Sequence, residues 1–221
     1  MNRAAKKRVG ILISGRGSNM MSLIEASNAP GYPAQIAIVI SNRPEAAGLA
    51  RARDAGIEAI GLDHRAFTTR DAFDEAMHAA LMTARVEIVC SAGFMRILSS
   101  RFVERWRDRL LNIHPSLLPL FKGLHPQRQA LEAGVKISGC SVHFVRPEMD
   151  SGPIVAQAAV PVLEGDTEAT LEARILQAEH VLYPSALRLV ADGQVRIEHE
   201  RVLISTAAKT SEASDFLHPY P

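Results

Sequence analysis

The sequence predicts an α/β fold: a mostly parallel sheet with helices on both faces and an antiparallel part toward the C-terminus. Short apolar runs alternate with longer amphipathic stretches over roughly the first 90 residues, which is typical of strand–helix–strand units with right-handed crossovers. After residue 98 this alternation stops, and two apolar runs follow one another across an Asp-Ser-Gly-Pro turn. The 221 residues, 47% of them hydrophobic, are enough for one continuous domain with a buried core.

Four strands and three helices are expected in the N-terminal part. The strand candidates are short runs of Val, Ile and Leu that stop at polar residues or glycine. We place them at Arg8–Ser14, Ala34–Ser41, Glu58–Leu62 and Val86–Ala92. The helix candidates have amphipathic periodicity. They span Ser18–Ala29, Glu45–Ala55 and Thr69–Ala84.

The C-terminal part is expected to be less regular. Ser116–Gly134 is expected to be a Pro- and Gly-punctuated loop that leads into a helix, and a turn at Asp150–Pro153 is expected to join two antiparallel strands. Thr167–Ala191 predicts a long helix that Pro184 should kink or divide. We expect the remaining strands at Leu110–His114, Ser138–Arg146 and Ile154–Val162, and a closing hairpin at Gln194–His199 and Arg201–Ile204. Residues 205–221 are expected to form a loosely held tail.

Composition argues against several classes of protein. Lys plus Arg (25) nearly equals Asp plus Glu (24), without a long block of like charge, so charge gives no support to a nucleic-acid or membrane-surface partner. The apolar run after the basic N-terminus is only about six residues long, too short for a signal peptide. No window approaches the roughly 18 apolar residues of a membrane span. Cys90 and Cys140 lie in apolar runs and are expected to be buried thiols. We therefore expect a cytoplasmic protein.

The segment Asn112–Pro119 (NIHPSLLP) is the strongest chemical signal. In a strand, Asn112 and His114 project from the same face, and Asp150 follows further along the chain. An amide donor, an imidazole and an acid can together stabilise and collapse a tetrahedral carbonyl adduct. This predicts an acyl-transfer enzyme. Each residue also has a structural interpretation: Asn112 as a turn cap, His114 as a core histidine and Asp150 as a turn former.

The glycine loop Gly15–Asn19 (GRGSN) lies between the first expected strand and helix. Ligands of open α/β sheets bind at such loops, and the backbone N–H groups at a helix N-terminus suit an anion. A Walker loop is excluded because the sequence contains no Gly-Lys-Ser/Thr. A dinucleotide-binding fingerprint is also excluded. Met20 stands where its last glycine or alanine should be, and Ser41–Arg43 lacks the acidic residue expected at the end of the second strand. A single phosphate is the better hypothesis. The alternative is a tight turn with Ser18 as an N-cap.

Several motifs occur in a family-like order: GRGSN, AGFMRIL at Ala92–Leu98, NIHPSLLP, SVHFVRPEMDSGP and QAEHVLYP at Gln177–Pro184. From about Arg8 to about Gln194 the chain resembles the phosphoribosylglycinamide formyltransferase family of folate-dependent enzymes. The resemblance implies a Rossmann-like formyltransferase fold. It also implies transfer of a formyl group from 10-formyltetrahydrofolate, the co-substrate, to the amine of glycinamide ribonucleotide in purine biosynthesis. Direct attack of the amine on the formyl carbonyl requires neither a metal nor a covalent intermediate.

The resemblance assigns residue roles. It implies that the catalytic group is Asn112, His114 and Asp150. It places the nucleotide on Gly17, Ser18, Asn19 and Glu179, with Glu179 at the ribose. It places the folate on Arg70, Met95, Arg96, Ile97, Leu98 and Asn112, and on Arg146, Pro147, Glu148, Met149 and Asp150. Residues 8–98 would then be a nucleotide-binding half, and residues 99–204 a catalytic and folate-binding half.

Some features of the site stay open or depart from the family. His143 either supports the site through a hydrogen bond or is only structural. Arg16 stands where asparagine is frequent, and the lead-in RPEM before Asp150 is less common than TDEL-like versions. Residues Lys122–His125 fit the family's mobile active-site loop.

Three rival functions are considered. A 10-formyltetrahydrofolate hydrolase usually has an extra N-terminal domain, and the first expected strand already starts by Arg8. A methionyl-tRNA formyltransferase has an additional C-terminal RNA-binding domain, which is not expected after Ile204. A non-catalytic nucleotide-binding protein would need the glycine loop alone. We expect small-molecule substrates, no nucleic-acid or membrane partner, and a monomer or homodimer.

Overall fold

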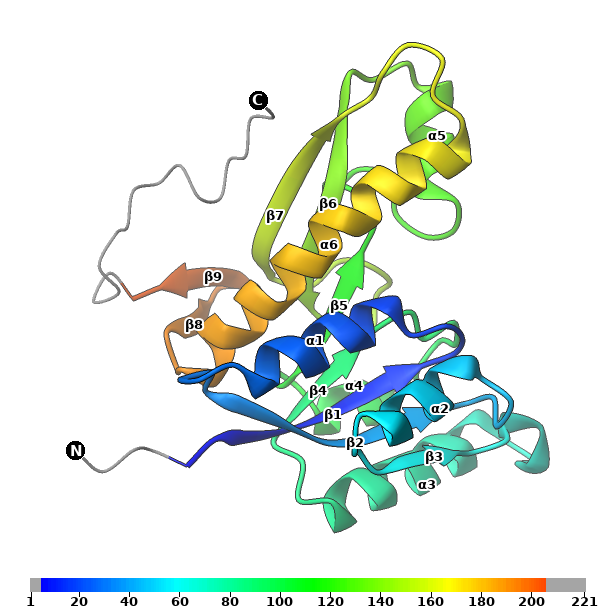
Figure 1. Ribbon diagram of the computed structural model, residues 1–221, viewed down its shortest axis with the longest axis vertical. Helices are drawn as coiled ribbons and strands as arrows, with labels where there is room; N and C mark the ends of the chain where they lie inside the picture. The colour runs from blue at the N-terminus through cyan, green and yellow to red at the C-terminus, as the bar shows by residue number, and fades with distance from the viewer. Residues whose placement is uncertain (1–4, 206–221) are drawn as a thin grey trace. The chain divides into compact units, whose positions relative to one another are not determined.

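The computed structural model describes residues 5–205 (Figure 1). They fall into two compact units, one ending at Asn112 and the other beginning at Ile113. The division lies later than residue 98, where the alternating pattern stops, and the single continuous domain stays a prediction. The expected loose tail, apart from Ser205, lies outside the described residues.

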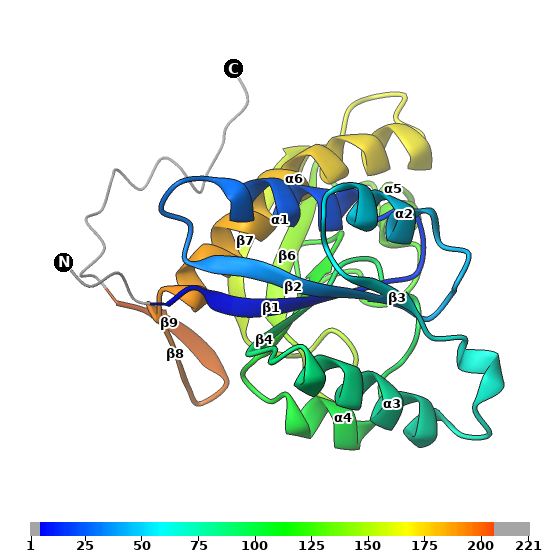
Figure 2. The ribbon, with the colours of Figure 1, turned by 60° about the horizontal axis from the view of Figure 1, so that its bottom comes forward.

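The first unit is a parallel sheet between two layers of helices. Its strands are β1 (Lys7–Ile13), β2 (Ala34–Ser41), β3 (Ala59–Gly61), β4 (Ile88–Ser91) and the start of β5 (Leu110–His114). Its helices are α1 (Ser18–Asn28), α2 (Ala47–Asp54), α3 (Arg70–Thr83) and α4 (Ser100–Arg105), with a short 3₁₀ turn at His64–Ala66. Helices α1 and α2 cover one face and α3 and α4 the other (Figure 2). Because both faces are covered, the strands are nearly continuous apolar runs; all of β4 is buried.

The second unit is built on an antiparallel pair of strands. Its elements are α5 (Pro126–Glu132), β6 (Ile137–Phe144), β7 (Ile154–Pro161), α6 (Glu168–Ala191), β8 (Val195–Glu198) and β9 (Arg201–Ile204). Helix α6 packs on β6 and β7, and α5 packs on α6. The β6–β7 register shifts between Val142 and His143, which marks a bulge. A bulge re-aims the side chains beside it, and here it lies next to His143.

The hydrogen-bonded strand order is β3-β2-β1-β4-β5-β6-β7, with β8 and β9 as a separate two-stranded sheet. The ladders of β1 to β5 are parallel and that of β6 with β7 is antiparallel. This confirms the predicted α/β class with its antiparallel C-terminal part. The bounds of β2 and β5 coincide with the predicted ones.

Two expectations about helices need correction. Pro184 does not divide the predicted long helix, because α6 runs unbroken through it over 24 residues. The buried neighbours Leu182, Tyr183 and Ala186 hold that turn in place, and their burial outweighs the hydrogen bond that proline cannot donate. Helix α4 was not predicted. Its signal is the cap Ser99, whose hydroxyl accepts a hydrogen bond from the Phe102 N–H at 3.3 Å.

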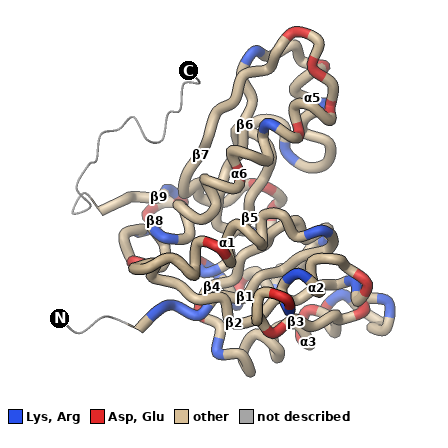
Figure 3. The backbone as a smooth tube through the Cα atoms, viewed as in Figure 1, with Lys and Arg blue, Asp and Glu red and all other residues tan. Residues whose placement is uncertain are grey.

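Charged residues of both signs are distributed along the backbone. In Figure 3 basic and acidic positions are interspersed over α2, β3 and α3. Within the described residues, no helix has the length and apolar content needed to cross a membrane.

Candidate active site

Strand β5 carries the NIHPSLLP residues that the sequence singles out. Asn112 pairs in the ladder with Ser91 of β4, and His114 is the last residue of the strand. Because they are two residues apart on one strand, their side chains share a face. Asn112 is half-buried, whereas His114 is only 6% exposed. The predicted strand is therefore confirmed at the position where the chemistry requires it.

His114 and Asp150 come together in the second unit. His114 Nδ1 lies 3.5 Å from Asp150 Oδ2, and His114 Nε2 lies 3.0 Å from the carbonyl oxygen of Phe121. Both ring nitrogens therefore face acceptors, an arrangement that suits an imidazolium with two N–H donors. Asp150 Oδ2 also accepts a hydrogen bond from the Gly123 N–H at 2.9 Å. The side chains of Asp150 and His114 therefore contact each other, and each also contacts the backbone of the loop at residues 121–123.

His143 also lies beside Asp150 but differs in character. It is 1% exposed, and its Nε2 lies 3.8 Å from Asp150 Oδ1. Its Nδ1 lies 3.0 Å from the Phe144 carbonyl oxygen, which can only accept, so Nδ1 carries the proton. Burial, ahead of the opposing effects of Phe144 and Asp150, lowers the pKa of His143 to about 4. His143 is therefore uncharged at pH 7 and lines the site as a buried side chain, without acting as a proton donor.

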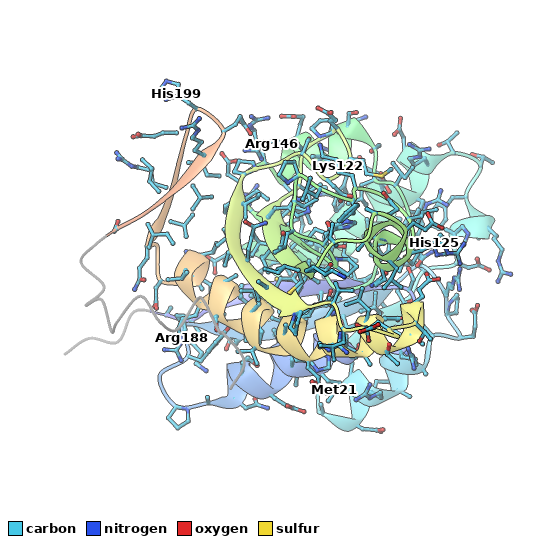
Figure 4. The ribbon with its side chains drawn as sticks, turned by 90° about the horizontal axis from the view of Figure 1, so that it is seen from above. Met21, Lys122, His125, Arg146, Arg188 and His199 are labelled. Carbon is cyan, nitrogen blue, oxygen red and sulfur yellow. The ribbon has the colours of Figure 1, made fainter. Side chains whose placement is uncertain are left out.

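Helix α5 and the start of α6 hold the loop that reaches His114 and Asp150. Gln129 Nε2 donates to the carbonyl oxygens of Lys122 (3.2 Å) and Leu124 (2.9 Å). His125 Nδ1 lies 3.2 Å from Glu168 Oε1. The loop backbone is left-handed at Phe121 (φ 53°), Gly123 (φ 78°) and His125 (φ 55°). Left-handed conformations at non-glycine residues are strained, so these side-chain contacts stabilise an otherwise unfavourable path. Figure 4 labels Lys122 and His125 in this segment.

The glycine loop of the first unit ends at the N-terminus of α1. Gly17 precedes the helix in a left-handed conformation (φ 70°), and an added Cβ would lie 3.0 Å from Met20 and 3.3 Å from Gly48. Ser18 is the first helical residue and not the cap, which corrects the alternative interpretation of this turn. Among the described residues, no side chain forms a capping hydrogen bond at the N-terminus of α1, and the first turn of this helix contains no Asp or Glu. Its N–H groups therefore suit an anion.

The segment Ala92–Leu98 presents apolar side chains at the surface of the first unit. Met95 is 73% and Ile97 58% exposed. The Met95 N–H donates to Ser14 Oγ at 2.7 Å, and this hydroxyl donates to Asn42 Oδ1 at 2.6 Å. These two hydrogen bonds fix the backbone that carries the exposed side chains.

Two predicted folate arginines lie near the start of α3. The Arg96 guanidinium stacks 5.1 Å from the ring centre of Phe73. Arg70 is the first residue of α3 and lines a surface cavity of about 490 Å³. The cavity is lined by Thr69, Arg70, Asp71, Ser99, Ser100 and Arg101. The guanidinium groups of Arg70 and Arg101 in this lining suit a carboxylate ligand, although the lining also contains the carboxylate of Asp71.

The remaining predicted residues lie in the second unit. Glu179 on α6 is 5% exposed, and its charge, after burial, helps to raise the pKa of the Cys140 thiol. Arg146 is buried, whereas Pro147, Glu148 and Met149 are exposed. Cys90 and Cys140 are both buried, as predicted.

Comparison with known proteins identifies the family. A model of the formyl transferase family matches residues 7–187. The chain belongs to this formyl transferase family. Among curated relatives, the phosphoribosylglycinamide formyltransferase of Escherichia coli (strain K12) is 48% identical over 86% of this chain and 89% of that protein. The trifunctional purine biosynthetic protein adenosine-3 of Homo sapiens is 51% identical over 87% of this chain.

Solved structures agree with this formyl transferase assignment. The glycinamide ribonucleotide transformylase 1 from Symbiobacterium toebii superposes with a TM-score of 0.88 at 50% identity, covering 90% of this chain and 94% of that one. The match to the human trifunctional protein covers 19% of its length, and that to the protein of Drosophila pseudoobscura pseudoobscura covers 14%. The chain thus spans less than a fifth of these trifunctional relatives.

Sequence reasoning missed several contacts of this candidate site. Phe121 and Gly123 act through backbone groups, which leave no signal in side-chain patterns. Gln129 is one ordinary polar residue on a helix, and only the path of the loop shows its contacts. The interaction of Ser14 with Asn42 spans 28 residues. Its one available signal is a pair of polar residues at the ends of adjacent parallel strands.

Proposed function

We propose that this chain transfers the formyl group of 10-formyltetrahydrofolate to the amine of glycinamide ribonucleotide, giving formylglycinamide ribonucleotide and tetrahydrofolate in de novo purine biosynthesis. The observation that carries the proposal is the contact of His114 with Asp150 at the end of β5, the strand that also carries Asn112. Support comes from relatives bearing the transferase name that match this chain over nearly their whole lengths.

The catalytic step would be a direct attack. The amine nitrogen attacks the formyl carbon, and the carbonyl oxygen becomes an oxyanion. The Asn112 amide would donate to this oxyanion; loss of such a donor typically costs about 10²–10³-fold in rate. The bond between the formyl carbon and the folate nitrogen then breaks. That nitrogen receives a proton from the His114 imidazolium, and Asp150 accepts the amine proton through water.

Nucleotide binding would use the glycine loop and α6. The uncapped N-terminus of α1 favours a phosphate on Gly17, Ser18 and Asn19. The buried carboxylate of Glu179 would accept hydrogen bonds from ribose hydroxyls. The added charge of Arg16, which is exposed, would strengthen attraction of the phosphate from solution.

Folate binding would use both apolar and polar groups. The exposed side chains of Met95 and Ile97 offer apolar contact to the aromatic part of the cofactor, with Arg96 and Leu98 beside them in the chain. Arg70 would bind the glutamate carboxylates, and the backbone of Arg146–Asp150 would hold the pterin ring. The folate is a co-substrate, and the proposed steps need no metal.

The cellular setting is also a proposal. We propose a cytoplasmic enzyme whose partners are its small-molecule substrates, acting as a monomer or homodimer. The two halves would work as one formyltransferase domain.

The test is an absorbance assay of a 10-formyl folate analogue with the purified protein, with and without glycinamide ribonucleotide. Consumption that depends on the nucleotide supports the proposal. Consumption that ignores the nucleotide would instead identify a hydrolase. No consumption in either arm would leave a nucleotide-binding protein without this activity.

A further inference from the structure

Arg146 is a buried cation that the proposed chemical steps do not use. It comes two residues after the end of β6 and four residues before Asp150, and 8% of its side chain is exposed. An unpaired charge at such a position would be costly. The residue therefore depends on partners that the fold supplies.

Its main partner is Glu200, in the turn of the C-terminal hairpin. Arg146 Nε lies 2.6 Å from Glu200 Oε2, and Nη2 lies 3.4 Å from Oε1. This is a two-pronged contact between a guanidinium and a carboxylate, the geometry that makes such pairs directional. Nη1 donates to the Val145 carbonyl oxygen at 3.2 Å. Arg146 is thereby held at both ends of its guanidinium.

The hairpin turn is shaped for this contact. His199 (φ 50°) and Glu200 (φ 57°) are consecutive left-handed residues between β8 and β9. Two-residue hairpin loops with this backbone normally contain asparagine or glycine, so a histidine and a glutamate here carry strain. Strands β8 and β9 have four residues each, and an isolated hairpin of that size is marginal in water. Figure 4 labels Arg146 and His199, at the two sides of this contact.

The segment between β6 and β7 carries Asp150. Asp150 itself is left-handed (φ 50°). Just beyond it, Gly152 packs so closely on the Phe144 carbonyl that a Cβ would lie 1.8 Å from its oxygen. The ion pair of Arg146 therefore holds one end of this segment, and the close packing of Gly152 on Phe144 holds the other. Between them, Pro147, Glu148 and Met149 are exposed.

We propose that Arg146 and Glu200 are a positioning pair for formyl transfer, through which the β8–β9 hairpin fixes Asp150 against His114. The inference rests on the proposed function, because Asp150 acts in that reaction. In this proposal the two side chains of the pair touch no substrate; only the backbone of Arg146 belongs to the segment that would hold the pterin ring. Their effect passes through the backbone of residues 147–149.

The decisive variant is Glu200→Gln, which keeps the size of the side chain and removes its charge. The matched control is Glu198→Gln on the same hairpin, whose carboxylate pairs with Arg196 at 2.9 Å. We expect Glu200→Gln to lower kcat about tenfold, as small displacements of catalytic groups do, with the KM for the nucleotide changed less than about twofold. Glu198→Gln should leave both constants unchanged. In an Asp150→Asn background, Glu200→Gln should cause no further loss of kcat.

Amide hydrogen exchange separates failure of this inference from failure of the proposed function. Glu200→Gln should accelerate exchange in residues 147–151, and Glu198→Gln should not. This readout needs no activity, so it decides the inference even if the wild-type protein transfers no formyl group. The positioning role would be overturned by any of three results. These are unchanged exchange in residues 147–151 of Glu200→Gln, an equal effect of Glu200→Gln and Glu198→Gln, and a further loss of kcat when Glu200→Gln is added to Asp150→Asn.

Discussion

His114 Nε2 lies 3.0 Å from the carbonyl oxygen of Phe121, seven residues further along the chain. Asp150 contacts the same loop, through the N–H of Gly123. In this conformation the loop backbone therefore contacts two of the three side chains that we propose to be catalytic. In the proposed reaction, substrates would compete with the loop for His114 and Asp150, so the stability of the loop would affect turnover.

The first prediction concerns the side chain that holds this loop. Gln129→Ala removes the two hydrogen bonds to the carbonyls of Lys122 and Leu124. We expect amide exchange in residues 121–125 to become about thirtyfold faster, because the two bonds together contribute about 2 kcal/mol. Gln177→Ala, at an exposed position on α6, is the control and should change nothing there. Unaltered exchange in the Gln129 variant would contradict the structural role of this contact.

The second prediction concerns the carboxylate beside His114. Asp150→Asn keeps an acceptor for the Gly123 N–H and removes the negative charge. We expect kcat to fall about 10²–10⁴-fold, as for the loss of a positioned acid or base, with an unchanged circular dichroism spectrum. Asp192→Asn, an exposed carboxylate at the end of α6, should retain full activity. Near-normal turnover of Asp150→Asn would refute the proposed mechanism, and the same applies to His114→Ala.

The third prediction is a pH dependence of stability caused by His143. Burial lowers its pKa from the ordinary 6.5 to about 4, so between these values the unfolded state binds more protons than the folded state. Stability then rises with pH across this window and is lost as the pH falls from about 6.5 toward 4. The full effect is roughly 3 kcal/mol.

Urea denaturation at several pH values tests this sign. The variant His143→Gln should flatten the dependence between pH 4 and 6.5. His199→Asn, which alters an exposed histidine, should leave it as in the wild-type protein. A wild-type protein whose free energy of unfolding is constant over this range would disprove the neutral, buried state of His143.

The fourth prediction concerns Gly152, beside Asp150. A Cβ added here would lie 1.8 Å from the Phe144 oxygen, so Gly152→Ala must displace backbone and should lower the free energy of unfolding by about 3 kcal/mol or more. Gly134→Ala is the comparison. It has positive φ (65°) but nothing within 4 Å of the new Cβ, and should cost about 1 kcal/mol. Equal Tm changes in the two variants would rule out the close contact as the cause.

The parts of the fold predicted from the sequence are those governed by local pattern. Strands β2 and β5 match the prediction residue for residue, because apolar runs of that length with clear polar ends have one natural interpretation. In α6, only the predicted division at Pro184 was wrong, because the local preference of proline to end a helix is overridden by the burial of Leu182 and Tyr183. Tertiary packing of this kind has no signature in a single segment.

The site was predictable to the extent that side chains carry it. Asn112 and His114 follow from strand periodicity, and the contact of His114 with Asp150 follows from the family motif. The partners of these residues in the loop are backbone groups at Phe121 and Gly123, which any sequence provides. The ion pair of Arg146 with Glu200 joins residues 54 positions apart. An arginine or a glutamate in a sequence does not indicate which residue it will pair with.

The central claim is formyl transfer to the nucleotide amine at His114 and Asp150. The most direct measurement is a single-turnover reaction with folate labelled by ¹³C in the formyl group, followed by ¹³C NMR in the presence of glycinamide ribonucleotide. The account predicts that the label moves into the formamide of the nucleotide in the wild-type protein, and stays on the folate in Asp150→Asn. Label appearing as free formate in the wild-type protein would contradict it.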